Sequence, residues 1–329
     1  MAYDNVLKYS DIIKAKKNLS SHIINTPLIY DYFLSKKFDA NIFFKAENIQ
    51  RTGSFKFRGA YNKIYNTINN NNNNIPKGIL AWSSGNHAQG VAEAANIFNL
   101  KATIVMPKDA PNIKIQGTKS KGAKIIFYNR KTENREEIGK EIAKKNNLLI
   151  VPPYDDKYVI AGQGTIGLEI IKQLNKYNLI PDKILVPTGG GGLIAGIASV
   201  IKNKYKNTNI YCVEPSKFSD YSKSLKSMKI IKNNMNNISI CDSLLASEPG
   251  KITFKINRSL LKRGITVSDN QVLKAINYAY KNLGLIVEPG GAVALAAILN
   301  NKTAIKKKTV VAILSGSNID PLVLKKAIL

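Results

Sequence analysis

The sequence predicts an α/β protein of two domains, in which twisted, mostly parallel sheets are covered by helices. Its 329 residues and 44% hydrophobic content can form a large core, and at roughly 150 residues per domain the length suggests about two domains. Apolar runs typical of strands alternate with helical patterns, which indicates parallel sheets with helices on both faces. The strand runs are 79–82, 103–106, 124–127, 148–151, 184–186, 209–212 and 310–314, and the clearest helical patterns are 89–98 and 133–145.

Two breaks in this pattern divide the chain. The asparagine run at 69–74 is of low complexity and predicts a flexible surface loop, and a Pro-Pro pair at 152–153 forms the second break. Four of the strand runs lie between the two breaks. We therefore expect a small, mobile domain at 74–152, inserted into a large domain made of residues 1–70 and 153–329.

The formal charge of +27 raises the possibility of a nucleic-acid partner, because a basic surface attracts phosphate. The lysines are scattered, however, and Asn, Ile and Lys are enriched together, as in proteins from AT-rich genomes. We therefore expect no nucleic-acid partner. We also expect no membrane partner, because the most apolar segment, 292–299, is too short to span a bilayer, and we see no export segment. Cys212 and Cys241 are too few for a disulfide framework, which favours the cytoplasm.

Lys56 is the first candidate functional residue, because it lies at the bend between a loop and a helix start in the run Gly53-Ser54-Phe55-Lys56-Phe57-Arg58-Gly59-Ala60. A lysine held at such a turn can form a Schiff base with an aldehyde. Three loops supply the rest of a cofactor pocket: Ser83-Ser84-Gly85-Asn86-His87, Gly189-Gly190-Gly191-Gly192-Leu193 and Ser315-Gly316-Ser317-Asn318. One lysine and three glycine-bearing loops predict a site for pyridoxal phosphate.

The four-glycine loop is the best candidate for a phosphate cradle. It follows the strand run 184–186 and opens a helix at Leu193, so backbone N–H groups and the helix N-terminus can approach an anion. An alternative is a dinucleotide site, since Gly190-x-Gly192-x-x-Ala195 satisfies the relaxed fingerprint and Glu214 follows on the next strand. Because Lys56 and Asn86 would have no role in a nicotinamide site, the phosphate cradle is preferred.

These four segments, in this order, resemble the serine/threonine dehydratase and serine racemase family, the fold type II pyridoxal phosphate enzymes with a tryptophan synthase β-like fold. The similarity also includes Ile23-Ile24-Asn25-Thr26-Pro27-Leu28, Phe43-Phe44-Lys45-Ala46-Glu47-Asn48 and Ala161-Gly162-Gln163-Gly164-Thr165, so it covers nearly the whole chain. It implies that the large domain binds the cofactor. The chain ends soon after the loop at 315–320, as we expect of short catabolic-type members without an effector-binding domain.

The resemblance assigns roles to individual residues. Cofactor binding falls to Phe55, Lys56, Asn86, Gly189, Gly190, Gly191, Gly192, Leu193, Glu288 and Ser315. Among these, Asn86 would contact the phenolic oxygen and Ser315 the ring nitrogen, while Glu288 would face the ring edge. A hydroxyl at the ring nitrogen leaves it largely unprotonated, which favours β-elimination.

The loop at 83–87 would bind the substrate α-carboxylate through Ser83, Ser84, Asn86 and His87. Ordinary helix capping by Ser83 or Ser84 is the alternative for the serines, and a satisfied core histidine is the alternative for His87. In the racemases a serine at the position of Ser84 stands opposite the lysine and exchanges a proton. Lys56 and Ser84 are therefore the candidate catalytic residues.

The mechanism that the resemblance implies is dehydration followed by deamination. Lys56 would anchor the cofactor and remove the Cα proton, and the β-hydroxyl would leave as water. L-threonine or L-serine would then give a 2-oxo acid and ammonia. Serine racemisation is an alternative, and so is dehydration of hydroxyaspartate or of an ectoine-breakdown intermediate, because the run Cys241-Asp242-Ser243-Leu244-Leu245 is similar to that bacterial branch. We expect a homodimer or homotetramer.

A divalent cation is the second cofactor that the resemblance implies. In related racemases and dehydratases a glutamate, a backbone carbonyl and an aspartate hold the ion, and these positions are Glu214, Phe218 and Asp220. Two carboxylates and a carbonyl suit Mg²⁺ or Ca²⁺. The alternative is a solvent-facing acidic pair.

Overall fold

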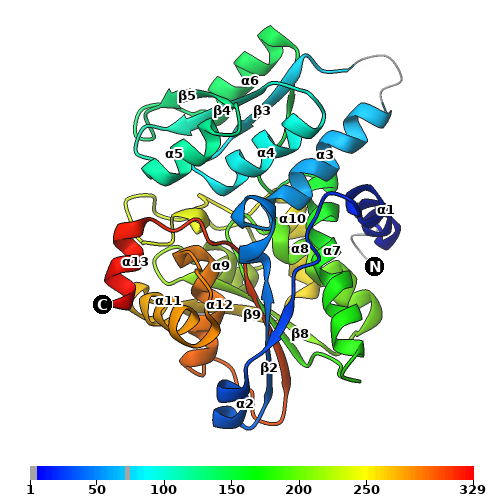
Figure 1. Cartoon of the computed structure of the whole chain (residues 1–329), viewed down its shortest axis with the longest axis vertical. Helices are drawn as coiled ribbons and strands as arrows, with labels where there is room; N and C mark the ends of the chain where they lie inside the picture. Colours follow the sequence, from blue (N-terminus) through cyan, green and yellow to red (C-terminus); the bar gives the residue numbers. More distant parts are fainter. Residues whose placement is uncertain (1–5, 71–74) are drawn as a thin grey trace.

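The computed structural model describes residues 6–70 and 75–329, and the chain forms two sheets with helices around each (Figure 1). The larger sheet has the strand order β1-β2-β10-β7-β8-β9. All its neighbouring strands run parallel except β1, which pairs antiparallel with β2. Its strands are β1 (Leu28–Tyr30), β2 (Asn41–Ala46), β7 (Lys183–Pro187), β8 (Asn209–Pro215), β9 (Arg263–Val267) and β10 (Thr309–Leu314).

The smaller sheet is entirely parallel and has the order β5-β4-β3-β6. Its strands are β3 (Gly78–Trp82), β4 (Ala102–Pro107), β5 (Lys124–Tyr128) and β6 (Leu148–Ile150). All four lie inside the predicted small domain. That this segment moves as a domain stays a prediction.

The helices cover both faces of the sheets. They are α1 (Tyr9–Leu19), α2 (Tyr32–Phe38), α3 (Lys56–Asn70), α4 (Asn86–Ile97), α5 (Asn112–Lys119), α6 (Arg135–Asn146), α7 (Lys157–Asn175), α8 (Gly192–Lys204), α9 (Asp220–Ser227), α10 (Lys251–Leu260), α11 (Asp269–Leu283), α12 (Pro289–Leu299) and α13 (Pro321–Ile328), with 3-10 turns at Glu47–Ile49, Arg51–Gly53 and Asp242–Leu244. In the part of the chain that the structure describes, no helix is both long and apolar enough to cross a membrane.

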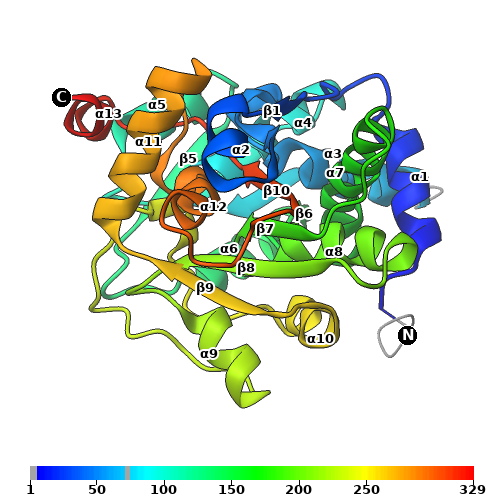
Figure 2. The same cartoon turned by 90° about the horizontal axis from the view of Figure 1, so that it is seen from below.

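The core lies on both sides of the larger sheet, because successive strand residues point to opposite faces. In β7, Ile184 and Val186 belong to the cluster that includes α7 and α8, while Leu185 belongs to the cluster that includes α11 and α12. Figure 2 shows α12 and α10 on opposite sides of β9. A parallel sheet buried on both faces explains why its strands read as continuous apolar runs.

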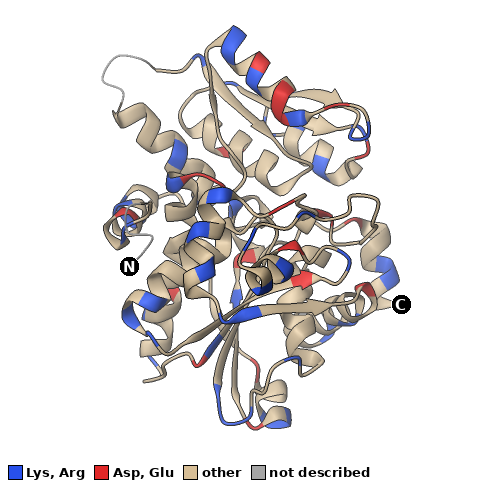
Figure 3. Ribbon diagram, turned by 180° about the vertical axis from the view of Figure 1, so that it is seen from behind, with Lys and Arg blue, Asp and Glu red and all other residues tan. Residues whose placement is uncertain are grey.

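The predicted α/β class with mostly parallel sheets is confirmed, and the ends of every predicted strand agree with the structure to within three residues. The helix expected at 89–98 begins earlier, at Asn86. The loop predicted over the asparagine run is wrong at its start, because Asn69 and Asn70 are the last residues of α3. Residues 71–74 lie outside the described residues. Lys and Arg are spread over helices, strands and loops around both sheets (Figure 3).

Candidate active site

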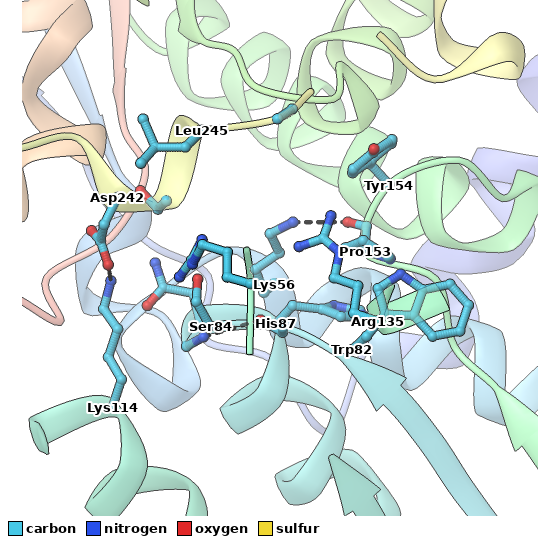
Figure 4. Close-up of a pocket in the computed structure, with 16 residues that line it drawn as sticks. Lys56, Trp82, Ser84, His87, Lys114, Arg135, Pro153, Tyr154, Asp242 and Leu245 are labelled. Carbon is cyan, nitrogen blue, oxygen red and sulfur yellow. Dashed lines mark hydrogen bonds and ion pairs between the residues drawn. The ribbon is translucent and has the colours of Figure 1, made fainter. Parts of the chain in front are cut away.

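Two adjoining cavities lie where strands of both sheets end. The first we call the glycine cavity, and it is lined by every residue that we expected to bind the cofactor: Phe55, Lys56, Asn86, Gly189, Gly190, Gly191, Gly192, Leu193, Glu288 and Ser315. The second we call the serine cavity, and its lining includes Ser83, Ser84, Asn86 and His87 (Figure 4). Lys56, Asn86, Tyr154 and Ser243 line both, so Lys56 stands where the cavities meet.

Lys56 is the first residue of α3, and the loop after β10 fixes the segment before it. Ser54 forms an isolated antiparallel bridge with Gly316, and the Phe55 N–H donates to the Ser315 carbonyl at 3.3 Å. These backbone contacts bring the segment before Lys56 together with the loop at 315–318, although the two are more than two hundred residues apart in the sequence.

Arg58, two residues after Lys56, fixes the beginning of α3 from the other side. Its fully buried guanidinium donates to Glu47 at 2.8 Å and to Glu169 of α7 at 2.6 Å. Breaking such a buried pair by removing one partner costs about 3–5 kcal/mol, because a charge is left without compensation. The network therefore holds Lys56 in a defined position.

The Lys56 amine has the properties of a nucleophile and base. Its Nζ donates to the Pro153 carbonyl at 2.8 Å. Removal from water lowers the pKa of Lys56 to about 8; the Glu288 carboxylate opposes this shift and the Arg135 guanidinium adds to it. The uncharged amine, which imine formation and proton removal both require, is therefore more populated near neutral pH than for an ordinary lysine.

The four-glycine loop joins β7 to α8 and has the shape of a cradle that could hold an anion. Gly191 has φ of +92°, and a Cβ there would collide with Tyr221 Oη, while a Cβ on Gly190 would collide with the Tyr154 ring. The first helical bond of α8 runs from the Ala195 N–H to the Gly191 carbonyl, which leaves the earlier N–H groups of the helix for a ligand. A phosphate fits this loop.

Side chains of α10 donate hydrogen bonds to carbonyl groups of the four-glycine loop. The Gly190 carbonyl accepts from Thr253 Oγ1 at 2.6 Å, and the Gly191 carbonyl accepts from Asn257 Nδ2 at 3.2 Å. Thr253 and Asn257 both lie on α10. Sequence reasoning missed these two residues, because nothing in their own segment distinguishes them from ordinary helical positions.

The loop between β3 and α4, in the serine cavity, could hold a second anion. The first helical bond of α4 runs from Gln89 N–H to the Gly85 carbonyl, so the N–H groups of Asn86 and His87 precede the helical ladder. Neither Ser83 nor Ser84 is the helix cap, since Gly85 occupies that position and Ser83 Oγ accepts from the Gly85 N–H at 3.1 Å. The capping alternative is therefore wrong, and the loop remains suited to a carboxylate.

His87 is buried and its tautomer is fixed. Its Nε2 lies 2.8 Å from the Val151 carbonyl, so Nε2 carries the proton and Nδ1 is left as an acceptor without a partner among the described residues. Burial, together with the positive charge of Lys56, lowers the pKa of His87 to about 3. The neutral ring cannot donate to a carboxylate from Nδ1, so His87 would contribute through its backbone N–H.

Asn86 and Glu288 meet between the two cavities. Asn86 Nδ2 donates to Glu288 Oε1, and Asn86 Oδ1 accepts from Asn318 Nδ2 at 2.9 Å. Lys114 Nζ forms ion pairs with Asp242 at 2.6 Å and with Glu288 at 3.2 Å. Burial raises the pKa of Glu288, against the attraction of Lys114. Sequence reasoning placed Asn318 in a pocket loop without a role of its own, and it missed Lys114, which acts through residues distant in the chain.

The predicted metal residues lie apart from these cavities, at the end of β8 and the start of α9. Glu214, Phe218 and Asp220 are all buried, so the alternative of a solvent-facing acidic pair is wrong. Glu214 accepts from the N–H groups of Tyr221 and Ser222, each at 2.8 Å, and from Ser222 Oγ.

Two neighbouring carboxyl groups, those of Glu214 and Asp220, lie together in this position. Among the described residues neither Glu214 nor Asp220 forms an ion pair with Lys or Arg, and Asp220 Oδ2 has no hydrogen-bond partner. Burial raises the pKa of Glu214 to about 8 and that of Asp220 to about 7. No group of three or more His, Cys, Asp or Glu side chains suited to a metal occurs in residues 6–70 and 75–329.

Known proteins match this chain along nearly its whole length. The family model described as pyridoxal-phosphate dependent enzyme matches residues 19–316. The chain is 38% identical over 312 residues to L-threo-3-hydroxyaspartate ammonia-lyase of Saccharomyces cerevisiae, covering 95% of this chain and 93% of that one. It is 39% identical over 320 residues to the catabolic L-threonine dehydratase of Staphylococcus aureus, covering 96% and 90%.

Solved structures agree with these relatives. The threonine deaminase of T.th. has a TM-score of 0.88 at 35% identity, covering 95% of this chain and 98% of that one. Maize serine racemase has a TM-score of 0.89 at 32% identity, covering 98% and 97%. With a lysine between a glycine cradle and a helix-start loop, and with matches along nearly its whole length, the chain belongs to the family of pyridoxal-phosphate-dependent enzymes and has the fold type II architecture.

Proposed function

We propose that the protein dehydrates and deaminates a small β-hydroxy amino acid, such as L-threonine or L-serine, to a 2-oxo acid and ammonia. The observation that carries this proposal is the place of the Lys56 amine, between a cradle for phosphate and a loop for a carboxylate. The names of the relatives, a dehydratase and an ammonia-lyase, support the same type of reaction.

The residues present fit pyridoxal phosphate. Gly189 to Leu193 would hold its phosphate, Asn86 its phenolic oxygen and Ser315 its ring nitrogen, all from the glycine cavity. When bound, this cofactor withdraws electrons from the amino acid and makes the Cα proton acidic. Lys56, whose pKa is about 8, would accept that proton at Nζ. The N–H groups at the start of α4 would orient the α-carboxylate.

A panel of β-hydroxy amino acids tests this proposal directly. The purified holoenzyme should form a 2-oxo acid and ammonia in equal amounts from at least one member, and Lys56→Ala should form neither. Absence of product from the whole panel, with the cofactor bound, would overturn the proposed reaction.

Racemisation is a second candidate activity, favoured by Ser84. Its side chain lines the serine cavity with Lys56, from a different element, so that two proton-transfer groups could serve one substrate. We predict that Ser84→Ala reduces racemisation at least about tenfold more than elimination, because only racemisation needs a proton on the second face. Chiral chromatography and 2-oxo acid assays on one sample measure both rates. Equal losses, or no racemisation by the wild type, would exclude this role.

We further propose a divalent cation, Mg²⁺ or Ca²⁺, between Glu214, Asp220 and the Phe218 carbonyl. Two buried carboxylates without a basic partner among the described residues support it, because an ion with oxygen preference would supply the missing positive charge.

We also propose a homodimer or homotetramer in the cytoplasm. Two buried free cysteines support the location, and exposed aromatic residues such as Tyr32 and Phe33 support the assembly.

A further inference from the structure

The N-terminus of α10 is capped by a residue from another part of the chain. The N-cap position of the helix is Gly250, which has no side chain to accept a hydrogen bond. Asp155, in the segment between β6 and α7, supplies the acceptors instead. Its Oδ2 accepts from the Lys251 N–H at 3.0 Å, and its Oδ1 accepts from the N–H groups of Ile252 at 2.8 Å and Thr253 at 3.0 Å. A carboxylate there also favours the positive end of the helix dipole, so Asp155 fixes the start of α10.

α10 in turn holds the four-glycine loop. The Gly190 carbonyl accepts from the Gly250 N–H at 3.2 Å and from Thr253 Oγ1 at 2.6 Å. The Gly191 carbonyl accepts from Asn257 Nδ2 at 3.2 Å. These three donors belong to the N-cap and the first two turns of α10. The orientation of two loop carbonyls therefore depends on where the helix begins.

The peptide bond carries this orientation over to N–H groups of the loop. In a trans peptide the carbonyl of one residue and the N–H of the next point in opposite directions, and the peptide bonds of this loop are trans. Because the Gly190 and Gly191 carbonyls point toward α10, the N–H groups of Gly191 and Gly192 point away from it. Both residues line the glycine cavity, and within the described part of the chain neither N–H donates to another backbone group. These two donors remain for a phosphate.

The segment that contains Asp155 also contacts the loop and the lysine. A Cβ on Gly192 would lie 2.9 Å from the Tyr154 carbonyl oxygen, so the segment packs directly on the loop. The Pro153 carbonyl accepts from Lys56 Nζ at 2.8 Å (Figure 4). Three consecutive residues thus contact the lysine, the glycine loop and α10.

We propose that Asp155 is a positioning residue for the cofactor phosphate, which it serves through α10 and the glycine loop without touching the ligand. This inference rests on the proposed place of the phosphate. The adjacent Asp156 provides the contrast, because it caps a helix that lines neither cavity among the described residues. Its Oδ1 accepts from the N–H groups of Tyr158 and Val159 at the start of α7, and its Oδ2 pairs with Lys63 at 2.7 Å.

Titration of the cofactor-free full chain with two ligands tests the inference. Asp155→Ala should weaken binding of pyridoxal phosphate on the order of tenfold, as expected for a lost helix cap of ordinary strength. Binding of pyridoxal, which has no phosphate, should stay unchanged. Asp156→Ala also removes a helix cap and is the matched control, so it should lower the melting temperature and change neither affinity. Unchanged affinity for pyridoxal phosphate in Asp155→Ala, equal weakening for the two ligands, or equal weakening by the two variants would overturn the inference.

Two further variants test the route through α10, even if Asp155→Ala does not fold. Asp155→Asn keeps an oxygen for the N–H groups of Ile252 and Thr253, so its loss of affinity should be smaller and again confined to pyridoxal phosphate. Thr253→Val removes the hydroxyl that holds the Gly190 carbonyl and should weaken the same ligand. Because both changes act through one helix, the double variant should lose less than the product of the two single losses. Losses that multiply would overturn this route.

Gly191→Ala separates the role of Asp155 from the place of the phosphate. If Gly191→Ala weakens binding of pyridoxal phosphate and the Asp155 variants do not, the phosphate lies at the loop and the role of Asp155 is wrong. If none of these variants weakens binding, the proposed place of the phosphate is overturned together with the inference.

Discussion

Lys56 and His87 owe their unusual proton affinities to removal from water. Lys56 has its pKa lowered to about 8 and His87 to about 3, in each case mainly by burial. Their hydrogen-bond acceptors, the carbonyls of Pro153 and Val151, belong to one segment that follows β6. Motifs identified both residues in the sequence. Their protonation could not be predicted from it, because burial and these distant carbonyls determine it.

His87 should therefore stay neutral at pH values where an ordinary histidine is charged. Because the pKa of His87 is lower in the folded protein than in the unfolded chain, folding disfavours the protonated ring. The free energy of unfolding therefore decreases as the pH falls below about 6.5, the pKa of an ordinary histidine. Nitrogen-15 NMR of labelled histidine should show the Nε2-protonated tautomer of His87 from pH 7 down to about 4.5.

The chain has two histidines, so His22→Gln isolates the His87 signal. A His87 signal that titrates near pH 6.5 in the folded protein would contradict the buried, neutral assignment.

Arg135 shows what the sequence leaves out at the scale of single residues. It belongs to no motif, and its neighbours Glu136 and Glu137 suggest an ordinary charged helix start. Only the packing of the smaller sheet over the larger one brings it next to Lys56. A positive charge in the first helical turn was the one available signal, and it is weak by itself.

At the scale of elements, the strand-loop-helix unit from β7 to α8 depends on glycine at Gly191. We predict that Gly191→Ala weakens pyridoxal phosphate binding at least about tenfold, because a Cβ would collide with Tyr221 and the left-handed backbone costs about 1–2 kcal/mol. Fluorescence titration of the cofactor-free protein measures the affinity, and thermal denaturation measures the stability.

Gly284 provides the matched control, since it also has positive φ but no atom within 4 Å of an added Cβ. Gly284→Ala should lower stability modestly and leave cofactor affinity unchanged. Equal effects of the two substitutions on affinity would show that the cradle does not depend on the shape of the loop.

The unit from β8 to α9 should bind a divalent cation. Because an ion that binds only the folded protein stabilises it, exhaustive chelation should lower the melting temperature and activity together, and Mg²⁺ should restore both. Glu214→Ala should behave like the chelated protein and no longer respond to Mg²⁺. A wild type that contains no bound metal and melts at the same temperature after chelation would exclude this site.

At the scale of the whole molecule, the sequence predicted the strands of the smaller sheet together with β7, β8 and β10, and it missed β1, β2 and β9. β1 has only three residues, and β1 and β9 are the edges of the larger sheet, where an apolar run is not required. In β2 the buried Lys45 interrupts the apolar run, and it is tolerated because it pairs with Glu169 at 2.6 Å. Patterns of single segments cannot show such pairing.

The arrangement of the whole molecule explains why the loops that form the site could be predicted from the sequence, whereas its charge pairing could not. Loops after parallel strands converge at the carboxyl ends of a sheet. The glycine loop after β7 and the loop at 315–318 after the neighbouring β10 therefore had to lie close together. The resemblance to a family supplied the roles of the individual side chains. Lys114 and Arg135 enter the site only through packing between distant segments. The mobility expected of the segment 74–152 stays a prediction.

Borohydride reduction of the holoenzyme, followed by peptide mass spectrometry, tests the central claim most directly. Reduction fixes an imine between pyridoxal phosphate and its lysine as a stable amine, so we predict one modified peptide, carrying the cofactor on Lys56. The visible absorbance band and the enzymatic activity should be lost in proportion to that modification. Lys56→Ala, treated in the same way, should carry no cofactor at any lysine. Modification of another lysine in place of Lys56, or full activity after complete reduction, would contradict the assignment of Lys56 as anchor and base.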